Sequence, residues 1–295
     1  MDNQLRMETE ARNIIRRLLD NGFQAFFVGG YVRDLLLGKK TEDIDIATSA
    51  RPEDVMRLFA HTIPTGIKHG TVTVMAGPYA FEVTTFRREG PYTEHRRPQQ
   101  VDFIGDIRAD LARRDFTINA MAMDIDGKLV DPFGGREDLE RKTLRTVGDP
   151  FARFQEDALR LMRCLRFAAA YQLTIEPATW QALLEKRPHL RHIAMERVRT
   201  ELEKMIEGPH PYTAVRLLAE SRLSEYTKKN AGLAARHWTA AENSRAVLDI
   251  QSLADNDLKW TALFLLIGFS PAETEQSLRA LTFSGRRMRS VVAPL

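Results

Sequence analysis

The chain has 295 residues, of which 43% are apolar and 8% aromatic, and this predicts two or more domains with buried cores. Its 43 Lys and Arg residues against 40 Asp and Glu give a net charge of +3, and the apolar content excludes intrinsic disorder as the main state. No stretch approaches the roughly 20 apolar residues of a membrane-spanning helix. The N-terminus lacks the order of a signal peptide and the single Cys164 permits no internal disulfide, so we expect a cytoplasmic protein without membrane association.

The first part of the chain alternates between helix and strand patterns, which predicts an α/β or α+β domain. Apolar residues at helical spacing predict helices over 8–19, 31–38 and 49–59. A short apolar run and three alternating stretches predict strands over 25–28, 43–47, 71–75 and 81–86. The segment 87–100 is polar, contains Gly90, Pro91 and Pro98, and is predicted to be a mobile loop without regular structure.

The remainder of the chain becomes helical. Residues 109–124 are predicted to be helical and then extended, and Asp126-Gly127 predicts a hairpin turn before a returning strand. Beyond Gly135 strand patterns almost vanish. Helices are predicted over 149–171, 177–186, 195–206, 213–221 and further segments as far as Leu281. The C-terminal half is therefore predicted to be all-helical.

Basic residues gather in two zones outside the first domain. Residues 141–166 hold seven basic side chains against three acidic ones, and 279–295 holds four arginines and no acid. Two such zones suggest an extended surface for a polyanion. Solvated helix faces give the same pattern and stay the alternative.

Two acidic residues, Asp43 and Asp45, are expected on one face of a strand because side chains alternate along it. Glu82 occupies a polar position of the strand at 81–86 and would complete a three-carboxylate cluster if the two strands are neighbours. Mg²⁺ prefers oxygen ligands and keeps part of its shell for substrate phosphates. The pattern favours a metal site for nucleotide chemistry, with exposed strand carboxylates as the alternative.

A phosphate-binding turn is predicted where the first strand leads into Gly29-Gly30, with Arg33 one helical turn later. A simple tight turn is the alternative for the two glycines. The P-loop pattern and the His-Asp dipeptide of metal phosphohydrolases are both absent from the sequence. Ala47 stands where a haloacid-dehalogenase-type phosphatase has Thr or Val.

Six motifs follow one another within residues 22–206, namely VGGYVRD, DIDIA, FEVTTFR, RRDFTINAMAMD, DPFGG and EDALRLMRCLRFAA. Together they resemble the class II tRNA nucleotidyltransferases, which comprise the CCA-adding enzymes and their sister bacterial poly(A) polymerases. The resemblance implies an α/β (α+β) polymerase-β-like nucleotidyltransferase head domain followed by all-α neck and body domains. We expect the head at 1–137, the neck with base recognition at 138–206 and the tRNA-binding body at 207–295.

The resemblance also implies a metal centre. Asp43 and Asp45 match the pair that holds two Mg²⁺ ions in the family. Two such ions assist attack of an RNA 3′-hydroxyl on the α-phosphorus and steady the departing pyrophosphate. Glu82 matches a glutamate near the metals, which either ligates an ion or orients the site.

Further matches concern the nucleotide. Gly30 and Arg33 match triphosphate-binding positions, and Arg114 matches an arginine that contacts the nucleotide. Asp115 and Asn119 would lie near the ribose. Asp115 equally suits a helix N-cap, and that alternative stays open.

The helix predicted over 156–171 matches the family's base-reading element. Asp157 and Arg160 would share one helix face at i and i+3, and Arg163 and Arg166 continue the series. A carboxylate accepts from the exocyclic amine of C or A, while a guanidinium donates to the neighbouring ring acceptor. G and U present a carbonyl and a ring N–H instead, so the pair would admit CTP and ATP and reject GTP and UTP. A surface salt bridge is the alternative.

The resemblance favours template-independent addition of C, C and A to the tRNA 3′ end from CTP and ATP. Ala158 stands where the poly(A) polymerases usually have Pro, and Arg96-Arg97-Pro98 is intact in a loop that CC-adding enzymes partly lack. In the family this loop acts as a lever on the base-reading residues. Poly(A) addition, CC-only addition and a catalytically silent RNA-binding module stay as alternatives.

Family members usually continue past the point where this chain ends. We therefore expect a chain truncated before the tail, in which Arg286, Arg287 and Arg289 begin an RNA-binding surface. The sequence leaves the oligomeric state open, with a homodimer as one option.

Overall fold

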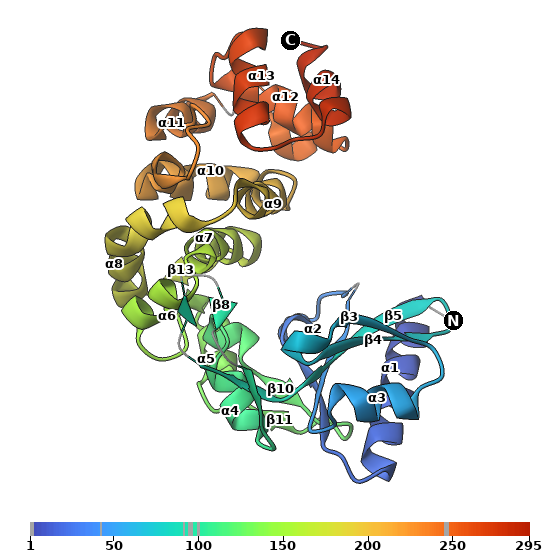
Figure 1. The fold of residues 1–295 in the computed structure, drawn as a ribbon. Coiled ribbons are helices and arrows are strands. Elements are labelled where there is room, and N and C mark those ends of the chain that lie inside the picture. The colour runs from blue at the N-terminus through green and yellow to red at the C-terminus, as the bar shows by residue number, and fades with distance from the viewer. Residues whose placement is uncertain (1–2, 42, 91, 94–96, 99–100, 245–247) are drawn as a thin grey trace. The chain divides into compact units, whose positions relative to one another are not determined.

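The computed structural model of the chain describes residues 3–41, 43–90, 92–93, 97–98, 101–244 and 248–295. Two compact units make up the chain (Figure 1). Residues up to Tyr92 together with Pro98–Gly148 form the first unit, and Asp149–Leu295 with Thr93 and Arg97 form the second. The three-part division into head, neck and body stays a prediction.

A seven-stranded mixed sheet forms the centre of the first unit, in the order β11-β10-β1-β2-β5-β4-β3. The strands are β1 (Ala25–Val28), β2 (Asp45–Thr48), β3 (Thr62–Gly66), β4 (Thr71–Ala76), β5 (Tyr79–Thr85), β10 (Ala122–Met123) and β11 (Leu129–Val130). β2 and β5 run parallel, whereas the other neighbouring pairs are antiparallel. The strands predicted at 25–28, 71–75 and 81–86 are confirmed because apolar runs and alternation are local signals.

The first unit also contains helices. They are α1 (Asn3–Asp20), α2 (Gly30–Leu36), α3 (Pro52–Leu58), α4 (Ile107–Ala112) and α5 (Gly135–Glu140), with the 3-10 turns η1 (Ile67–His69) and η2 (Thr117–Asn119). α1 contacts β1 and β2, while α3 contacts β4, β5 and α1 (Figure 1). α1 buries Ala11, Ile14, Ile15 and Leu18, which recur at helical spacing, so its apolar stripe fixes it to the sheet.

The structure corrects two predictions for the first hundred residues of the chain. The strand predicted at 43–47 begins only at Asp45, so Asp43 precedes it. The segment 87–100 is not devoid of regular structure, because β6 (Arg87–Glu89) pairs antiparallel with β9 (Val101–Phe103), and β7 (Tyr92–Thr93) pairs with β8 (Arg97–Pro98). Backbone pairing needs no apolar alternation, which is why the side-chain pattern missed it. Arg96 lies outside the described residues, and the predicted lever motion stays a prediction.

Helices dominate the second unit, as predicted, apart from short strand segments such as β13 (Thr174–Ile175). The helices are α6 (Pro150–Glu156), α7 (Leu159–Tyr171), α8 (Pro177–Lys186), α9 (Met195–Ile206), α10 (Pro211–Ser221), α11 (Ala235–Asn243), α12 (Asn256–Leu266), α13 (Pro271–Ala280) and α14 (Gly285–Val292). The 3-10 turns are η3 (Arg187–His192), η4 (Leu223–Tyr226) and η5 (Ile250–Ser252). Among the described residues, none of the helices combines the length and the apolar character that crossing a membrane requires.

The single helix predicted over 149–171 is wrong. Two helices occupy this range, and Asp157 stands between them with φ −136° and ψ 104°, outside helical geometry. The Asp157 side chain accepts a hydrogen bond from the backbone N–H of Leu159 at 3.0 Å. An aspartate that bonds to the backbone two residues ahead competes with helix continuation, and it caps the first turn of α7 instead.

Candidate functional site

Three carboxylates line one cavity of the first unit. Ile46 of β2 lies opposite Val83 of β5, so Asp45 and Glu82 each come one residue before this pair. The sequence could not show that these strands are neighbours, and the structure does. Asp43, Asp45 and Glu82 line a cavity of about 370 Å³ together with Thr73 of β4.

Asp45 lies partly buried beside the other two carboxylates of this cavity. The pKa of Asp45 is raised to about 6, mainly by burial and in addition by the charges of Glu82 and Asp43, while Arg114 acts in the opposite direction. An ionised carboxylate that is partly desolvated beside two others is destabilised, and a bound cation relieves that repulsion. This donor set therefore fits a hard metal ion.

The described residues contain no group of three or more His, Cys, Asp or Glu side chains placed so that they could hold a metal ion. The predicted three-carboxylate cluster is thus present as a shared cavity lining and not as a closed ligand cage. Asp43 is exposed and Asp45 is partly buried, which leaves the cavity side of the pair open. Mg²⁺ typically binds one or two protein carboxylates and completes its shell with water and substrate phosphates.

The Gly29-Gly30 turn joins β1 to α2. Gly29 has φ +67°, and a Cβ there would lie 2.8 Å from Nη1 of Arg114. Arg33 on α2 is 6% exposed; its Nε and Nη2 donate to the carboxylate of Asp34 at 3.0 Å each, and its Nη1 donates to Oδ1 of Asn119 at 2.5 Å. The turn thus brings two guanidinium groups close to the backbone, which suits an anion.

Arg114 lies just past the end of α4. It is held by Asp110, whose carboxylate is 1% exposed and accepts from Arg113 Nε at 2.9 Å and Arg114 Nη2 at 3.5 Å. Asp110 also accepts from the backbone N–H of Arg87 at 3.1 Å. Burial lowers the pKa of Arg114, and the charge of Asp110 opposes this. The sequence analysis missed Asp110. This acid precedes one arginine by three positions and the next by four, and both spacings are typical of ion pairs on a helix.

Asp115 and Asn119 bond to each other as well as to their surroundings. Oδ1 of Asp115 accepts from the backbone N–H of Phe116 at 2.8 Å and from Nδ2 of Asn119 at 3.1 Å. Asn119 in turn accepts from Arg33. Asp115 therefore supports the local turn and, through Asn119, reaches the arginine of the Gly-Gly turn, but it is not the helix N-cap of the alternative, because Phe116 holds the cap position of η2.

The base-reading residues predicted in the second unit are arranged differently from the expected helix face. Nη2 of Arg197 on α9 donates to Oδ2 of Asp157 at 3.2 Å. Arg160, 7% exposed, donates to Oε2 of Glu156 at 2.6 Å and to the carbonyl of Arg153 at 3.1 Å. The two predicted partners are each oriented by another side chain, because the helix break turns Asp157 out of the α7 periodicity.

The other two arginines of the series lie on α7 near Phe167. The Cζ atom of Arg163 lies 5.1 Å from the centroid of that ring, and the Cζ atom of Arg166 lies 4.0 Å from it. Nε of Arg166 donates to Oε2 of Glu201 at 2.6 Å, and Glu201 is 4% exposed. Arg166 thus links α7 to α9. Sequence reasoning missed Glu201, whose partner lies 35 residues away.

Two family models and several known proteins match the chain. Residues 25–145 match the model of the poly A polymerase head domain, and residues 172–230 match that of a probable RNA and SrmB-binding site of polymerase A. The CCA-adding enzymes of Geobacillus stearothermophilus and Geobacillus thermodenitrificans are 49% and 51% identical to the chain over 248 and 217 residues, or 81% and 74% of it. The matches cover 61% and 54% of those relatives, so the chain spans somewhat more than half their length.

Solved structures give the same result. The Bacillus stearothermophilus CCA-adding enzyme in complex with CTP matches with a TM-score of 0.87 at 41% identity, over 99% of this chain and 69% of that one. The Thermotoga maritima CCA-adding enzyme complexed with tRNA shares the fold, with a TM-score of 0.72 at 22% identity over 99% of this chain and 69% of that one. The chain therefore belongs to the class II tRNA nucleotidyltransferase family, which groups CCA-adding enzymes with bacterial poly(A) polymerases, and its sheet unit has the polymerase-β-like nucleotidyltransferase fold.

Proposed function

We propose that the chain carries a template-independent CCA-adding activity, which extends the tRNA 3′ end by C, C and A from CTP and ATP and releases pyrophosphate. The observation that carries this proposal is the cavity in which Asp43, Asp45 and Glu82 meet, with Arg114 acting on Asp45. The relatives named as CCA-adding enzymes support the choice of product. We also propose a cytoplasmic location.

Asp43 and Asp45 would hold two Mg²⁺ ions, because nucleotidyl transfer generally depends on metal ions and these carboxylates border an open cavity. When bound, such ions make an RNA 3′-hydroxyl a better nucleophile and stabilise the departing pyrophosphate. Glu82 adds negative charge beside Asp45 and would orient the site. Gly30, Arg33 and Arg114 would bind the triphosphate, since both guanidinium groups are oriented before any ligand arrives.

Asp157 and Arg160 would select the base by the complementary pattern that C and A share. Each is already oriented, Asp157 by Arg197 and Arg160 by Glu156, so little rotamer entropy is lost when the base binds. A base with the wrong pattern leaves a polar group unpaired, which costs about 1 to 3 kcal/mol. Arg163 and Arg166 would extend this surface along α7.

The test uses Mg²⁺ and a tRNA that lacks its terminal CCA, supplied with CTP alone, ATP alone or both, with products resolved on a sequencing gel. We expect two added nucleotides with CTP and three with both. A long ladder with ATP alone would identify a poly(A) polymerase instead, and a stop at two with both would identify CC-only addition.

The controls are Asp43→Ala and Asp45→Ala, which should abolish extension. Extension that survives both changes would contradict the assigned metal site. RNA binding without any extension by the unaltered chain would support the silent RNA-binding module.

A further inference from the structure

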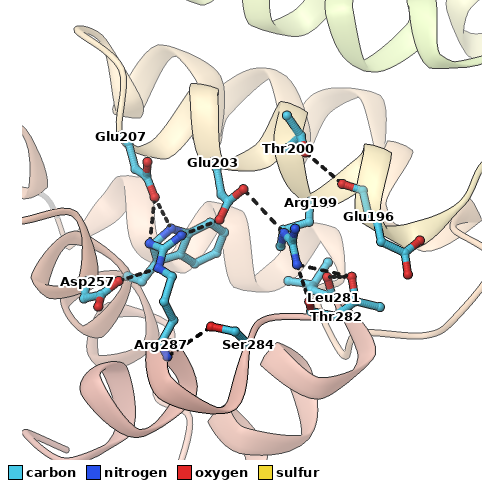
Figure 2. Close-up of polar contacts among 11 residues, drawn as sticks. Glu196, Arg199, Thr200, Glu203, Glu207, Asp257, Leu281, Thr282, Ser284 and Arg287 are labelled. Atoms are coloured by element: carbon cyan, nitrogen blue, oxygen red, sulfur yellow. Dashed lines mark hydrogen bonds and ion pairs between the residues drawn. The ribbon is translucent and has the colours of Figure 1, made fainter. Parts of the chain in front are cut away.

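A single arginine connects three elements near the C-terminal end of the second unit. Arg287 of α14 donates to Glu203 of α9, to Glu207 at the C-cap of that helix and to Asp257 of α12 (Figure 2). Its Nη2 lies 3.0 Å from Oε1 of Glu207, and its Nε lies 2.7 Å from Oδ1 of Asp257. We call these four residues the Arg287 clamp.

Further polar contacts join the same elements. Glu207 accepts from Nε1 of Trp260 at 3.0 Å, and its backbone carbonyl accepts from Nζ of Lys259 at 2.9 Å. Arg199 of α9 donates to the carbonyl of Thr282, just before α14 (Figure 2). The end of α9 is therefore tied to α12 and α14 by a network that includes the clamp.

The clamp changes how the arginines of α14 are interpreted. Arg286 and Arg289 are exposed, but the Arg287 side chain is only 31% exposed, and its guanidinium lies 5.0 Å from the centroid of Phe283. Arg287 thus differs from the other two in being ion-paired and less exposed, and one RNA-binding surface formed by all three arginines stays a prediction. The composition of 279–295 gives the number of its charges. It does not show that carboxylates from other parts of the chain lie beside Arg287.

Loss of Arg287 would leave three carboxylates together without their shared cation. Like charges in a partly desolvated cluster repel, and the guanidinium of Arg287 now offsets all three, while Arg199 lies 3.5 Å from Glu203 as a second cation. The helices α12 to α14 bury Trp260, Phe264, Leu278 and Val291, so they hold a core that does not depend on the clamp. Repulsion in the clamp should therefore loosen the attachment of these helices to α9 without unfolding them.

We infer that Arg287 is a positioning residue for RNA binding, which fixes α14 to α9 so that the exposed Arg286 and Arg289 face RNA from a set position. This inference rests on the proposed RNA substrate. Neighbouring arginines of one helix thus have two roles. Arg287 holds the surface in place, whereas Arg286 and Arg289 contact phosphates.

The experiment compares Arg287→Met with Arg286→Met, because each removes one positive charge from α14. Hydrogen exchange of the full chain without RNA should become at least about tenfold faster at the end of α9 and at 282–287 in Arg287→Met and stay unchanged in Arg286→Met. The Kd for tRNA lacking CCA should rise about tenfold in Arg287→Met and about two- to threefold in Arg286→Met. The KM for CTP should change in neither variant.

Two results would overturn the inference, namely equal exchange in the two variants, or faster exchange in Arg287→Met without a larger change in Kd. Glu203→Gln, which keeps Arg287, should change the exchange rate and the Kd in the same direction but by less. If neither changed in Glu203→Gln, this result would count against the clamp even if Arg287→Met failed to fold. If the unaltered chain bound no tRNA, the proposed function and the RNA part of this inference would fail together. The exchange comparison would still decide whether the clamp holds α14.

Discussion

Nη2 of Arg197 donates to Oδ2 of Asp157 at 3.2 Å, although the two residues lie 40 positions apart in the sequence. The other oxygen of Asp157 accepts from the backbone of Leu159, so both sides of this carboxylate are held. The orientation of Asp157 therefore depends on α9 as well as on its own segment.

Arg197→Met should weaken base selection while nucleotidyl transfer persists, because the carboxylate loses one of its two fixed partners. We expect the ratio of kcat/KM for CTP to that for UTP to fall about tenfold, which corresponds to about 1.4 kcal/mol. Arg191→Met, an exposed change in the same unit, is the control. An unchanged ratio in Arg197→Met would show that Asp157 does not need this partner.

Asp45→Asn should stabilise the metal-free protein at neutral pH. The pKa of Asp45 is raised to about 6 from an ordinary value of 3.8, so the folded state holds this proton more tightly than the unfolded chain. Stability therefore falls as the pH rises from about 4 to about 6, and the full penalty applies above that range. In EDTA at pH 7.5 we expect a gain of up to about 3 kcal/mol in the free energy of unfolding, and almost none at pH 4.

Urea denaturation at both pH values measures this gain, with Asp43→Asn at the exposed neighbouring carboxylate as the control. Added Mg²⁺ should reverse the order, since it stabilises the unaltered protein more than Asp45→Asn. A gain of the same size at pH 4 would point to a cause other than the charge of Asp45.

Gly29→Ala should disturb both the turn and Arg114. Gly29 has φ +67°, and the new Cβ would lie 2.8 Å from Arg114 Nη1. Gly38 has φ +64° but nothing within 4 Å of its Cβ position, so Gly38→Ala is a matched control for the backbone alone. We expect a loss of about 2 kcal/mol in Gly29→Ala, and a rise in the KM for CTP only in that variant. If the KM for CTP were similar in both variants, Arg114 would have no part in binding the nucleotide.

Asp110→Asn should destabilise the first unit by about 2 to 4 kcal/mol, because it leaves the guanidinium groups of Arg113 and Arg114 without their buried counter-charge. Asp106→Asn alters only the exposed N-cap of the same helix, where Oδ1 of Asp106 accepts from the N–H of Arg108 at 2.9 Å. This change should lower the free energy of unfolding by about 1 kcal/mol or less. Denaturation midpoints of the two variants provide the comparison, and equal midpoints would argue against a special role for Asp110.

Local patterns predicted much of the fold. The apolar stripe of α1 and the alternation in β4 and β5 depend on residues a few positions apart, so the sequence suffices to find them. The break at Asp157 was missed because Ala158, Leu159 and Arg160 are ordinary helix formers, and a single side-chain bond to the backbone of Leu159 decides the outcome.

The candidate site divides in the same way. Asp43, Asp45 and Glu82 were found as residue types in polar strand positions, but their common cavity requires β2 and β5 to be neighbours, which is a property of the whole sheet. The partners Arg197 and Glu201 lie on a different helix from Asp157 and Arg166. Periodicity shows which face of a helix is polar, but it does not identify the helix that this face meets.

The helix break at Asp157 also limits how this family member could evolve. The same carboxylate that would choose the base caps the first turn of α7. A mutation that redirects nucleotide preference at this position would remove the cap as well, at a cost of about 1 kcal/mol. New specificities should therefore arise more readily through neighbours that tilt Asp157, such as Arg197, than through replacement of Asp157 itself.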